Sequence, residues 1–446
     1  MDEILIIGGG FAGLAAGVAL AGAGRRVRLL EQKPYLGGRA RSFRDASTGS
    51  IVDNGQHIFM GCYHSTIQFL KTIGTLDRVR FQPRLNVHFA GKEKGTTVLS
   101  CPQLPAPWHL LAGVLRSNSF TLGEKLQVLR LGRKLRSADS GSFSDLTVDG
   151  WMAKLGQSER LRRNFWDLLC IAALNEDPRI AAAAIFEPVL RLALFQSAAD
   201  SRIGLASKGL SECYTEAAAA YICARGGQIK LERNVTEFII EDNRGSGSVC
   251  RGVHLSDGTV VESSTVLSAV PCFHLARLLP ERLTSQVQFF AGVARMQPSP
   301  IISLHLWFDR EITALEFAGL RGTTIQWLFN RDKILGSGDR HVSLVISGAH
   351  QHIRREKEEL LEASMHELRE IFPAAREAKV LHSLVIKERF ATFSPSLSVV
   401  DLRPPAVTPI NGLFLAGDWT ETGLPATIEG AVKSGYTAAA EIMRRE

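Results

Sequence analysis

The sequence predicts an α/β fold in which one parallel sheet is assembled from three separated segments of the chain. The chain opens with a strand, a glycine-rich turn and a helix of small residues within residues 4–23. Two more buried strands are expected far downstream, at 265–270 and at 412–416, and the second of them precedes the final helix. A strand, a turn and a helix in this order are typical of a doubly wound sheet. The segments between these elements are expected to form a second region of the α+β class.

The first unit contains the motif Gly8-x-Gly10-x-x-Gly13 between its strand and its helix. Gly8 permits a tight turn, Gly10 leaves room for a pyrophosphate, and Gly13 lets the helix pack closely on the sheet. The free amides at the start of the helix favour the charge of a phosphate. Glu31 ends the second strand, where its carboxylate can accept hydrogen bonds from ribose hydroxyls. The unit is therefore of the Rossmann type and predicts a bound dinucleotide.

Two further stretches favour a flavin over a nicotinamide dinucleotide. Gly37-Gly38-Arg39 places a cation just beyond Glu31, where it can reach the same diphosphate from the other side. Gly417-Asp418 ends the last predicted strand beside the crevice, where a carboxylate suits the ribityl hydroxyls of a flavin. The final helix begins near residues 426–428 and directs its N-terminal dipole at the pyrimidine end of the flavin, which is often anionic when reduced. Together these features predict FAD.

The remaining elements follow from the periodicity of apolar residues. Short apolar or alternating runs predict strands at 26–30, 51–59, 228–231, 235–241, 301–309, 323–330 and 341–347, with hairpins at 86–100 and 251–261. Apolar residues at helical spacing predict helices at 64–72, 108–115, 122–135, 148–155, 159–175, 181–195, 209–225, 352–372 and 425–444.

The order of these elements predicts a Rossmann-type FAD-binding domain interleaved with an α+β substrate domain. Residues 1–80, 205–275 and 405–446 are expected to build the FAD-binding domain. Residues 81–204 are expected to form a mainly helical region that faces substrate or membrane. Residues 276–404 are expected to form a substrate domain of one sheet with a charged helix.

Composition narrows the class of protein. The 446 residues, 45% hydrophobic and 22% charged, predict a folded protein without a nucleic-acid motif. The net charge of +7 suits an anionic membrane surface or an acidic ligand, and equally a mildly basic surface without a partner. Seven cysteines without a CxxC pair predict reduced, buried thiols and no metal site, and the acidic Asp2 and Glu3 disfavour a signal peptide. We therefore expect a cytoplasmic protein without a transmembrane helix.

These motifs together resemble the flavin-dependent amine oxidase and phytoene desaturase superfamily. The resemblance rests on the glycine motif, on Glu31 and on AGDWTETGLPATIEGAVKSG at 416–435, and it covers essentially the whole chain. Within the superfamily, DNGQHIFMGCYHSTIQFL at 53–70 and WDLLCIAALNEDP at 166–178 look most like the squalene-associated branch, the hydroxysqualene dehydroxylases of bacterial hopanoid biosynthesis.

The resemblance implies that the residues of these motifs line one FAD site. The N-terminal residues would hold the diphosphate, the adenosine ribose and, through the backbone of Val235, the adenine. The stretch 55–57 would pass beside the isoalloxazine ring, and the C-terminal residues would hold the ribityl chain and a flavin carbonyl. The expected FAD-binding residues are Gly8, Gly10, Ala12, Gly13, Glu31, Gln32, Gly38, Arg39, Gly55, Gln56, His57, Val235, Gly417, Asp418, Trp419, Thr427 and Ile428.

The resemblance also implies a reaction, the replacement of the hydroxyl of hydroxysqualene by hydride from reduced FAD. His57 is the candidate proton donor because it lies in the stretch expected beside the ring and because histidine titrates near neutral pH; flavin contact or packing is the alternative. Asp53 is expected to pair with Arg39 or Arg41. Residues 175–177, Asn-Glu-Asp, are expected either to end a helix or to meet the substrate hydroxyl.

An apolar helix at 108–115 beside a basic helix at 122–136 predicts a peripheral membrane contact, on the inner face of the cell membrane. An access route there would suit an isoprenoid hydrocarbon dissolved in the bilayer. The alternative is that both helices pack into the substrate region. The basic face would consist of Arg130, Arg133, Lys134 and Arg136.

Three other functions use the same fold. A carotenoid desaturase would run an oxidation in the same tunnel, and a prenyl-lipid binding protein would have no redox role. An amine oxidase usually frames its flavin with paired aromatic residues, whereas this chain offers Phe393 and Trp419. The sequence after Gly336-Ser337-Gly338 does not complete a second dinucleotide motif, so we expect a separate electron donor. Neighbouring squalene-forming enzymes are further candidate partners.

Overall fold

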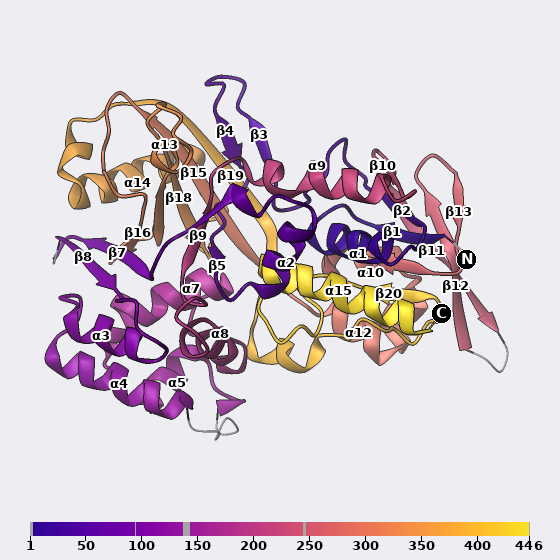
Figure 1. Cartoon of the computed structure of the whole chain (residues 1–446), viewed down its shortest axis with the longest axis horizontal. Helices are drawn as coiled ribbons and strands as arrows, with labels where there is room; N and C mark the ends of the chain where they lie inside the picture. Colours follow the sequence, from indigo (N-terminus) through magenta and orange to yellow (C-terminus); the bar gives the residue numbers. More distant parts are fainter. Residues whose placement is uncertain (1–2, 94, 137–142, 244–246, 446) are drawn as a thin grey trace.

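The structure is a computed structural model that describes residues 3–93, 95–136, 143–243 and 247–445. Two large sheets lie at opposite ends of the long axis of the molecule (Figure 1). Both chain ends lie beside the smaller of these sheets, and the helices of residues 108–195 gather below the larger one (Figure 1). No helix of the described ranges is both long and apolar enough to cross a membrane.

The smaller sheet is parallel throughout and has the strand order β10-β2-β1-β14-β20. Along β1, the side chains of Ile4 and Ile6 pack beneath helices α1, α9 and α15, whereas Leu5 and Ile7 pack against the opposite layer. Because both faces are covered, β1 is apolar at every position. The strands of this sheet are β1 (Ile4–Ile7), β2 (Val27–Leu30), β10 (Gln228–Lys230), β14 (Val266–Ser268) and β20 (Leu413–Leu415).

Three helices cover one face of this sheet, and a small antiparallel sheet with three helices covers the other. The first group is α1 (Phe11–Gly22), α9 (Leu210–Cys223) and α15 (Ile428–Arg445). The second group is β11 (Val235–Asn243), β12 (Gly247–Leu255), β13 (Val260–Glu262), α10 (Cys272–Leu278), α11 (Glu281–Gln286) and α12 (Gln288–Ala294).

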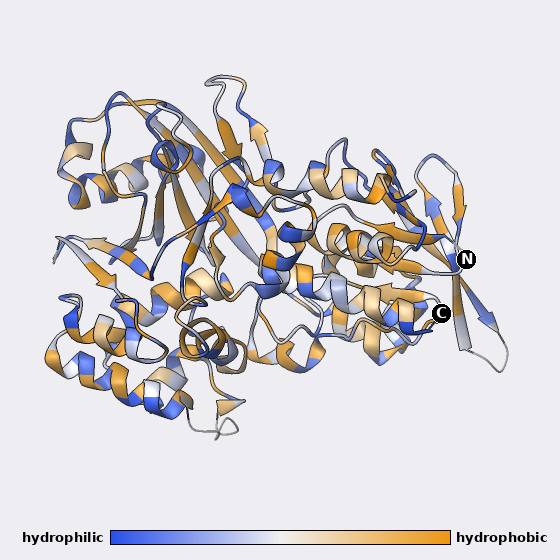
Figure 2. Cartoon of the chain, in the orientation of Figure 1, coloured by the Kyte–Doolittle hydropathy of each residue, from blue (hydrophilic) through white to orange (hydrophobic). Residues whose placement is uncertain are grey.

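The larger sheet has seven strands in the order β19-β15-β18-β17-β16-β7-β8. Helix α14 (Lys357–Ile371) packs on one face, and the helices of residues 108–195 pack on the other. Figure 2 shows hydrophobic residues along the strands of this sheet. The strands are β7 (Asn86–Gly91), β8 (Gly95–Ser100), β15 (Pro298–Phe308), β16 (Phe317–Arg321), β17 (Trp327–Asn330), β18 (His341–Ser347) and β19 (Val380–Phe393).

The helical layer below the larger sheet carries the apolar end of the site described below. Its helices are α3 (Trp108–Arg116), α4 (Leu122–Arg136), α5 (Val148–Lys154), α6 (Glu159–Leu161), a π-helical turn (Arg162–Trp166), α7 (Asp167–Leu174) and α8 (Ala183–Phe195). The helix expected at 159–175 is thus interrupted by the π turn. The side chain of Arg136, expected on the basic face of α4, lies outside the described part.

Short elements join the two large sheets. They are β3 (Ser42–Arg44) paired with β4 (Ile51–Asp53), and β5 (Phe59–Met60), β9 (Ile203–Ala206) and β6 (Val79–Phe81) in one three-stranded sheet. The remaining short helices are α2 (His64–Thr72), α13 (Arg331–Leu335), and single turns at Leu76–Arg78, Pro373–Arg376 and Leu397–Leu402. The strand expected at 51–59 is therefore two strands, and the turn between them carries His57.

Three features differ from the expected organisation. The hairpin β7–β8 pairs with β16, so segments 81–204 and 276–404 share one sheet and form one region instead of two. Helices α11 and α12 pack against the smaller sheet, which moves the boundary of that region beyond residue 275. Strand β19 was not expected, because six of its 14 side chains are polar or charged, and its place is set by a long antiparallel pairing with β15.

Candidate active site

A cavity of about 1650 Å³ runs from the glycine-rich turn after β1, between the two large sheets, to helices α3, α4 and α8. Its first part is lined by backbone and polar groups, and its far part is lined mostly by apolar side chains of the helical layer. Of the expected FAD-binding residues, the cavity is lined by Gly8, Gly10, Ala12, Glu31, Gln32, Gly38, Arg39, Gly55, Gln56, His57, Val235, Gly417, Asp418, Trp419, Thr427 and Ile428.

The glycine-rich turn leaves space on its cavity side and none on its protein side. Gly8 has a φ of +103°, a conformation that favours glycine. A Cβ atom on Gly10 would meet no atom within 4 Å, so it would point into the cavity. A Cβ atom on Gly13 would lie 2.0 Å from the carbonyl oxygen of Gly8, which explains why Gly13 packs the helix and does not line the cavity. The space at Gly10 fits a diphosphate at the start of α1.

Glu31 lies at the carboxyl end of β2 and is buried. One carboxylate oxygen accepts a hydrogen bond from the backbone N–H of Gly9 at 2.8 Å, and the other accepts one from Lys33 at 2.9 Å. These contacts fix the carboxylate and leave one acceptor position on each oxygen. The arrangement fits the two hydroxyls of an adenosine ribose.

Arg39 and Asp418 form a bidentate ion pair, with Nη2 2.8 and 2.9 Å from the two carboxylate oxygens. Arg39 also donates to the carbonyl oxygen of Ala391 at 2.6 Å. Burial tends to lower the pKa of Arg39, but the neighbouring Asp418 outweighs it and the pKa is raised. The two residues were expected to make separate contacts with FAD, whereas in the structure they contact each other. Their ion pair sets the position of both groups at the cofactor end.

Three residues that line the cavity each carry a buried polar atom without a protein partner among the described residues. They are Gln56 (Oε1), Thr392 (Oγ1) and, on strand β17 of the larger sheet, Trp327 (Nε1). Buried polar groups in proteins are nearly always hydrogen-bonded, so these atoms indicate a ligand with polar edges. Together with the space at Gly10 and the acceptor positions on Glu31, they show that this part of the cavity fits FAD. Thr392 was not found by sequence reasoning, because it lies at the end of the unexpected strand β19.

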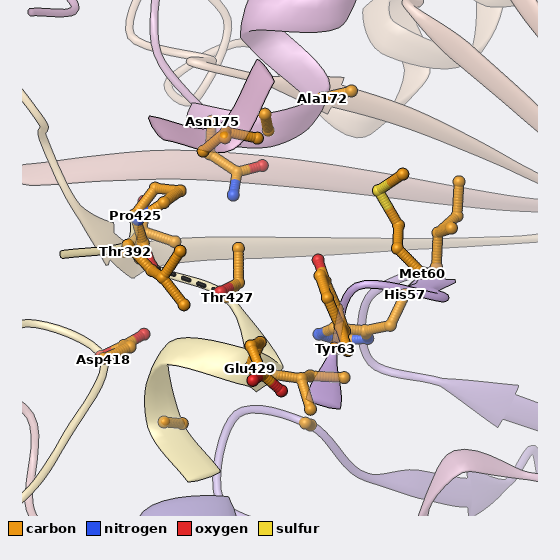
Figure 3. Close-up of a pocket in the computed structure, with 18 of the residues that line it drawn as sticks. His57, Met60, Tyr63, Ala172, Asn175, Thr392, Asp418, Pro425, Thr427 and Glu429 are labelled. Atoms are coloured by element: carbon orange, nitrogen blue, oxygen red, sulfur yellow. Dashed lines mark hydrogen bonds between the residues drawn. The ribbon is translucent and has the colours of Figure 1, made fainter. Parts of the chain in front are cut away.

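The start of helix α15 forms the floor of the cavity in Figure 3. The hydroxyl of Thr427 accepts a hydrogen bond from the backbone N–H of Gly430 at 3.0 Å and thus caps this helix. The carboxylate of Glu429 accepts hydrogen bonds from the backbone N–H groups of Ser65 and Thr66, both at 2.9 Å, and so anchors the start of α2. The dipole of α15 points at the cavity, as expected for the pyrimidine end of a flavin.

His57 lies in the turn between β4 and β5 and lines the cavity. Its Nδ1 is 2.7 Å from the carbonyl oxygen of Gly55. Because a carbonyl can only accept, Nδ1 carries the proton of the neutral ring. Burial lowers the pKa of His57, against the opposing charge of Asp53. At neutral pH the remaining nitrogen, Nε2, is therefore an unprotonated acceptor, which speaks against His57 as the proton donor that the sequence suggested.

Asp53 does not pair with Arg39 or Arg41, so this expectation was wrong. Its Oδ2 lies 2.8 Å from Nη2 of Arg331, and both side chains are buried. The other oxygen accepts hydrogen bonds from the hydroxyl of Ser42 at 2.6 Å and from the backbone N–H of Leu210 at 3.0 Å. Arg331 begins α13, 278 residues from Asp53 in the sequence, so no local pattern could identify the partner.

The three polar residues at 175–177 have different surroundings in the structure. Asn175 ends α7 in the left-handed conformation, with a φ of +54°, and its side chain lines the cavity. Glu176 is fully buried and contacts His350 at 3.0 Å, and Asp177 forms an ion pair with Arg179. Of the three residues, only Asn175 lines the cavity, although sequence reasoning left all three open.

Within the described ranges, no three His, Cys, Asp or Glu side chains gather in a way that could hold a metal ion. All seven cysteines are free, and all except Cys223 are buried. Burial raises the pKa of the Cys62 thiol, which lines the cavity, to about 12. This thiol is therefore protonated at neutral pH.

Comparison with known proteins identifies the family. The family described as "Flavin containing amine oxidoreductase" matches residues 11–443. The chain is 30% identical over 444 residues to the hydroxysqualene dehydroxylase of Zymomonas mobilis subsp. mobilis, which covers 98% of each chain. It is 26% identical over 473 residues to the 15-cis-phytoene desaturase of Synechococcus elongatus, covering 100% of this chain and 96% of the relative. An oxidoreductase from Methanosarcina mazei has the same fold, with a TM-score of 0.75, 19% identity and coverage of 99% and 100%. The chain belongs to the flavin-containing amine oxidoreductase family and is an FAD-dependent oxidoreductase.

Proposed function

We propose that this member of the flavin-containing amine oxidoreductase family removes the hydroxyl group of hydroxysqualene and yields squalene. The observation that carries the proposal is the single cavity that joins a polar cofactor end to a long apolar end. A C30 isoprenoid needs such an apolar channel, whereas a small amine does not. A relative of nearly equal length bears the name hydroxysqualene dehydroxylase.

The net reaction is that of reduced FAD with the alcohol to give oxidised FAD, the hydrocarbon and water. When bound, reduced FAD supplies the hydride that forms the new carbon–hydrogen bond. The carbon–oxygen bond breaks, and the oxygen leaves as water with the second hydrogen. The chain itself must hold the carbinol carbon about 3–3.5 Å from the hydride donor and must exclude bulk water. A separate two-electron donor, such as a flavin reductase or free reduced flavin, must restore the cofactor.

The bound cofactor would be held by the groups described above. Gly10 and the start of α1 would receive the diphosphate, and Glu31 the adenosine ribose. Asp418 and Thr392 would face the ribityl and ring portions. The helix dipole of α15 would favour negative charge on the reduced ring, and so would raise its reduction potential.

The experiment that tests the proposal is an anaerobic single turnover. The purified yellow protein is reduced with dithionite, freed of excess reductant and mixed with hydroxysqualene, and the flavin absorbance near 450 nm is followed together with extraction of the lipid. We expect the absorbance to return as squalene forms in equal amount. Oxidised protein that bleaches with phytoene, while reduced protein leaves hydroxysqualene unchanged, would instead establish a carotenoid desaturase. A colourless protein that takes up no FAD would refute both.

The same proposal includes a peripheral contact with the inner face of the cell membrane. The exposed fractions of Trp108 and Leu122 are 60% and 81%, and Leu115 and Leu126 of the same two helices are also exposed. Helices α3 and α4 line the far end of the cavity, and two of these exposed apolar residues, Trp108 and Leu126, line the cavity itself. Figure 2 shows that hydrophobic and hydrophilic residues are interspersed along these two helices.

This arrangement would let an isoprenoid pass from the bilayer into the cavity without crossing water. The cations of α4 would attract anionic headgroups. Flotation with vesicles that contain phosphatidylglycerol tests the contact. We expect co-flotation that decreases with added salt, and protein that stays in the dense fraction would count against the contact.

A further inference from the structure

Two neutral hydrogen-bond donors without a protein partner among the described residues face one another across the cavity. They are the amide of Asn175 and the hydroxyl of Tyr63, which point into the cavity from opposite sides (Figure 3). We propose that Asn175 and Tyr63 bind the hydroxyl oxygen of the substrate, and that this pair selects an alcohol over the corresponding hydrocarbon. The inference rests on the proposed function and deepens it.

Asn175 is held in one orientation by residues outside the cavity. Its Oδ1 accepts a hydrogen bond from the hydroxyl of Ser347 at 3.0 Å, and its backbone carbonyl accepts one from the hydroxyl of Ser299 at 2.5 Å. With Oδ1 occupied, the Nδ2 group is the part of the amide that faces the cavity (Figure 3). None of the described residues accepts a hydrogen bond from Nδ2. The side chain is therefore a donor in a fixed position.

The backbone at Asn175 indicates why asparagine occurs there. A φ of +54° is costly for most residues and is tolerated best by glycine, asparagine and aspartate. Glycine would satisfy the backbone but would bring no donor, and aspartate would bring only acceptors when ionised. Asparagine is thus the residue that combines the helix end with a donor aimed into the cavity.

Tyr63 lies directly before helix α2, whose start is anchored by Glu429 as described above. Its hydroxyl has no hydrogen-bond partner among the described residues and points into the cavity beside His57 (Figure 3). Burial raises the pKa of Tyr63, with a further contribution from Cys62. The phenol is therefore a stable donor at every physiological pH, and it offers the second hydrogen bond to the same oxygen.

An alcohol fits these donors in a way that a hydrocarbon cannot. The hydroxyl oxygen has two lone pairs, and the cavity offers two donors that point toward one space. As the carbon–oxygen bond breaks, negative charge grows on this oxygen, and fixed donors stabilise it more than they stabilise the bound alcohol. A hydrocarbon in the same place would leave both donors without partners, and a site with unpaired polar groups disfavours such a ligand.

The experiment compares two ligands of nearly equal shape, hydroxysqualene and squalene, on the oxidised FAD-loaded protein, which cannot turn over the alcohol. Flavin absorbance changes give the dissociation constants for the wild type and for Tyr63→Phe, Asn175→Gly and Asn175→Asp. We expect the wild type to bind the alcohol at least tenfold more tightly than the hydrocarbon. Each variant should weaken binding of the alcohol about fivefold, the value of one hydrogen bond, and should leave binding of squalene unchanged.

The matched control is Tyr221→Phe, which removes a tyrosine hydroxyl on helix α9, outside the cavity. It should leave both dissociation constants unchanged. Flavin content and thermal midpoint identify any variant that does not fold. Asn175→Gly is included because glycine tolerates the positive φ at this position and therefore keeps the backbone conformation.

The possible outcomes separate the inference from the proposed function. Equal binding of the two ligands by the wild type, or an unchanged preference in all variants, would overturn the role of the pair. If reduced wild type leaves hydroxysqualene unreacted but the variants lose the preference, the donor pair stands and the proposed reaction fails. If the reaction proceeds and the preference persists in the variants, the inference alone fails.

Discussion

The buried ion pair between Arg331 and Asp53 joins the region of the larger sheet to the strand that precedes His57. Arg331 has no exposed surface, and its Nε and Nη1 atoms have no hydrogen-bond partner among the described residues. In the variant Arg331→Met, Asp53 keeps the hydrogen bonds from Ser42 and Leu210 but loses its counter-charge. Removing one partner of such a pair costs about 3–5 kcal/mol. At about 2 °C per kcal/mol for a large domain, the thermal midpoint should fall by roughly 6–10 °C.

The double variant Asp53→Asn/Arg331→Met tests the cause of this loss. The asparagine can still accept the hydrogen bonds of Ser42 and Leu210, and no charge remains buried. Because the desolvation of two ions disappears together with their attraction, we expect the double variant to lie within about 1 kcal/mol of the wild type. Asp53→Asn alone should be as unstable as Arg331→Met alone, since it leaves the guanidinium without a counter-charge.

The thermal midpoints of the wild type, the two single variants and the double variant are measured from the rise in FAD fluorescence during a thermal ramp at one fixed rate. Urea unfolding followed by tryptophan fluorescence gives their free energies of unfolding. Losses of about 3–5 kcal/mol in each single variant and of at most about 1 kcal/mol in the double variant correspond to a coupling free energy of at least about 5 kcal/mol. A single variant Arg331→Met as stable as the wild type would refute the reasoning. So would a double variant whose loss equals the sum of the two single losses.

Three further predictions address the cofactor end, the buried histidines and the membrane-facing helices. Gly10→Val should bind little FAD, measured as absorbance at 450 nm per protein, and should have the thermal midpoint of the FAD-free wild type. Gly13→Ala should destabilise the fold itself, because its Cβ would lie 2.0 Å from a carbonyl oxygen. Burial lowers the pKa of His305 to about 4, below its unfolded value of about 6.5. The unfolded chain therefore binds a proton first, and stability should fall by about 3 kcal/mol as the pH drops from 6.5 to 4. His305→Gln should flatten this part of the pH profile in urea unfolding, and an unchanged profile would contradict the assignment. The pair Trp108→Glu and Leu122→Glu should abolish vesicle flotation without a change in midpoint, and continued flotation would show that other residues make the contact.

The N-terminal unit could be predicted because the residues that determine its structure are close together in the sequence. The strand Ile4–Ile7, the turn at Gly8 and the acidic residue Glu31 occur within a short stretch, and each has one dominant structural explanation. The same holds for helix α2, whose predicted bounds of 64–72 are those of the structure. The strands β14 and β20 were expected for a similar reason, since a sheet covered on both faces leaves uninterrupted apolar runs.

The features that sequence reasoning missed depend on contacts between distant segments. Strand β19 contains Lys387, Glu388 and Arg389, which mask its strand character, and it forms because β15 supplies a partner along almost its whole length. Asp53 belongs to segment 1–80, whereas its partner Arg331 comes from segment 276–404, and a carboxylate near two arginines in the sequence gave no hint of this pairing. The donor geometry of His57 depends on one backbone carbonyl, which no pattern of residue types encodes.

The site as a whole was predicted better than its chemistry. Residues that line the cofactor end follow from motifs, because a dinucleotide imposes the same backbone geometry wherever it binds. Tyr63, in contrast, faces the apolar part of the cavity, where many residue types are compatible with the fold, and Thr392 lies at the end of β19, a strand that the sequence did not predict. Tyr63 lies within the stretch 53–70 that carried the resemblance, and its position directly before a helix could have identified it.

The close packing of helix α15 on helix α1 has a consequence for how the protein is made. A Cβ atom at Gly435 would lie 2.3 Å from the carbonyl oxygen of Ala12, so the last helix sits directly on the first. A ribosome delivers the N-terminal unit early, yet this unit remains without Asp418 and without its covering helix until residues 418–445 emerge. Capture of the cofactor must therefore follow translation of α15, and a nascent chain arrested before Gly435 would expose the small-residue face of α1 to chaperones.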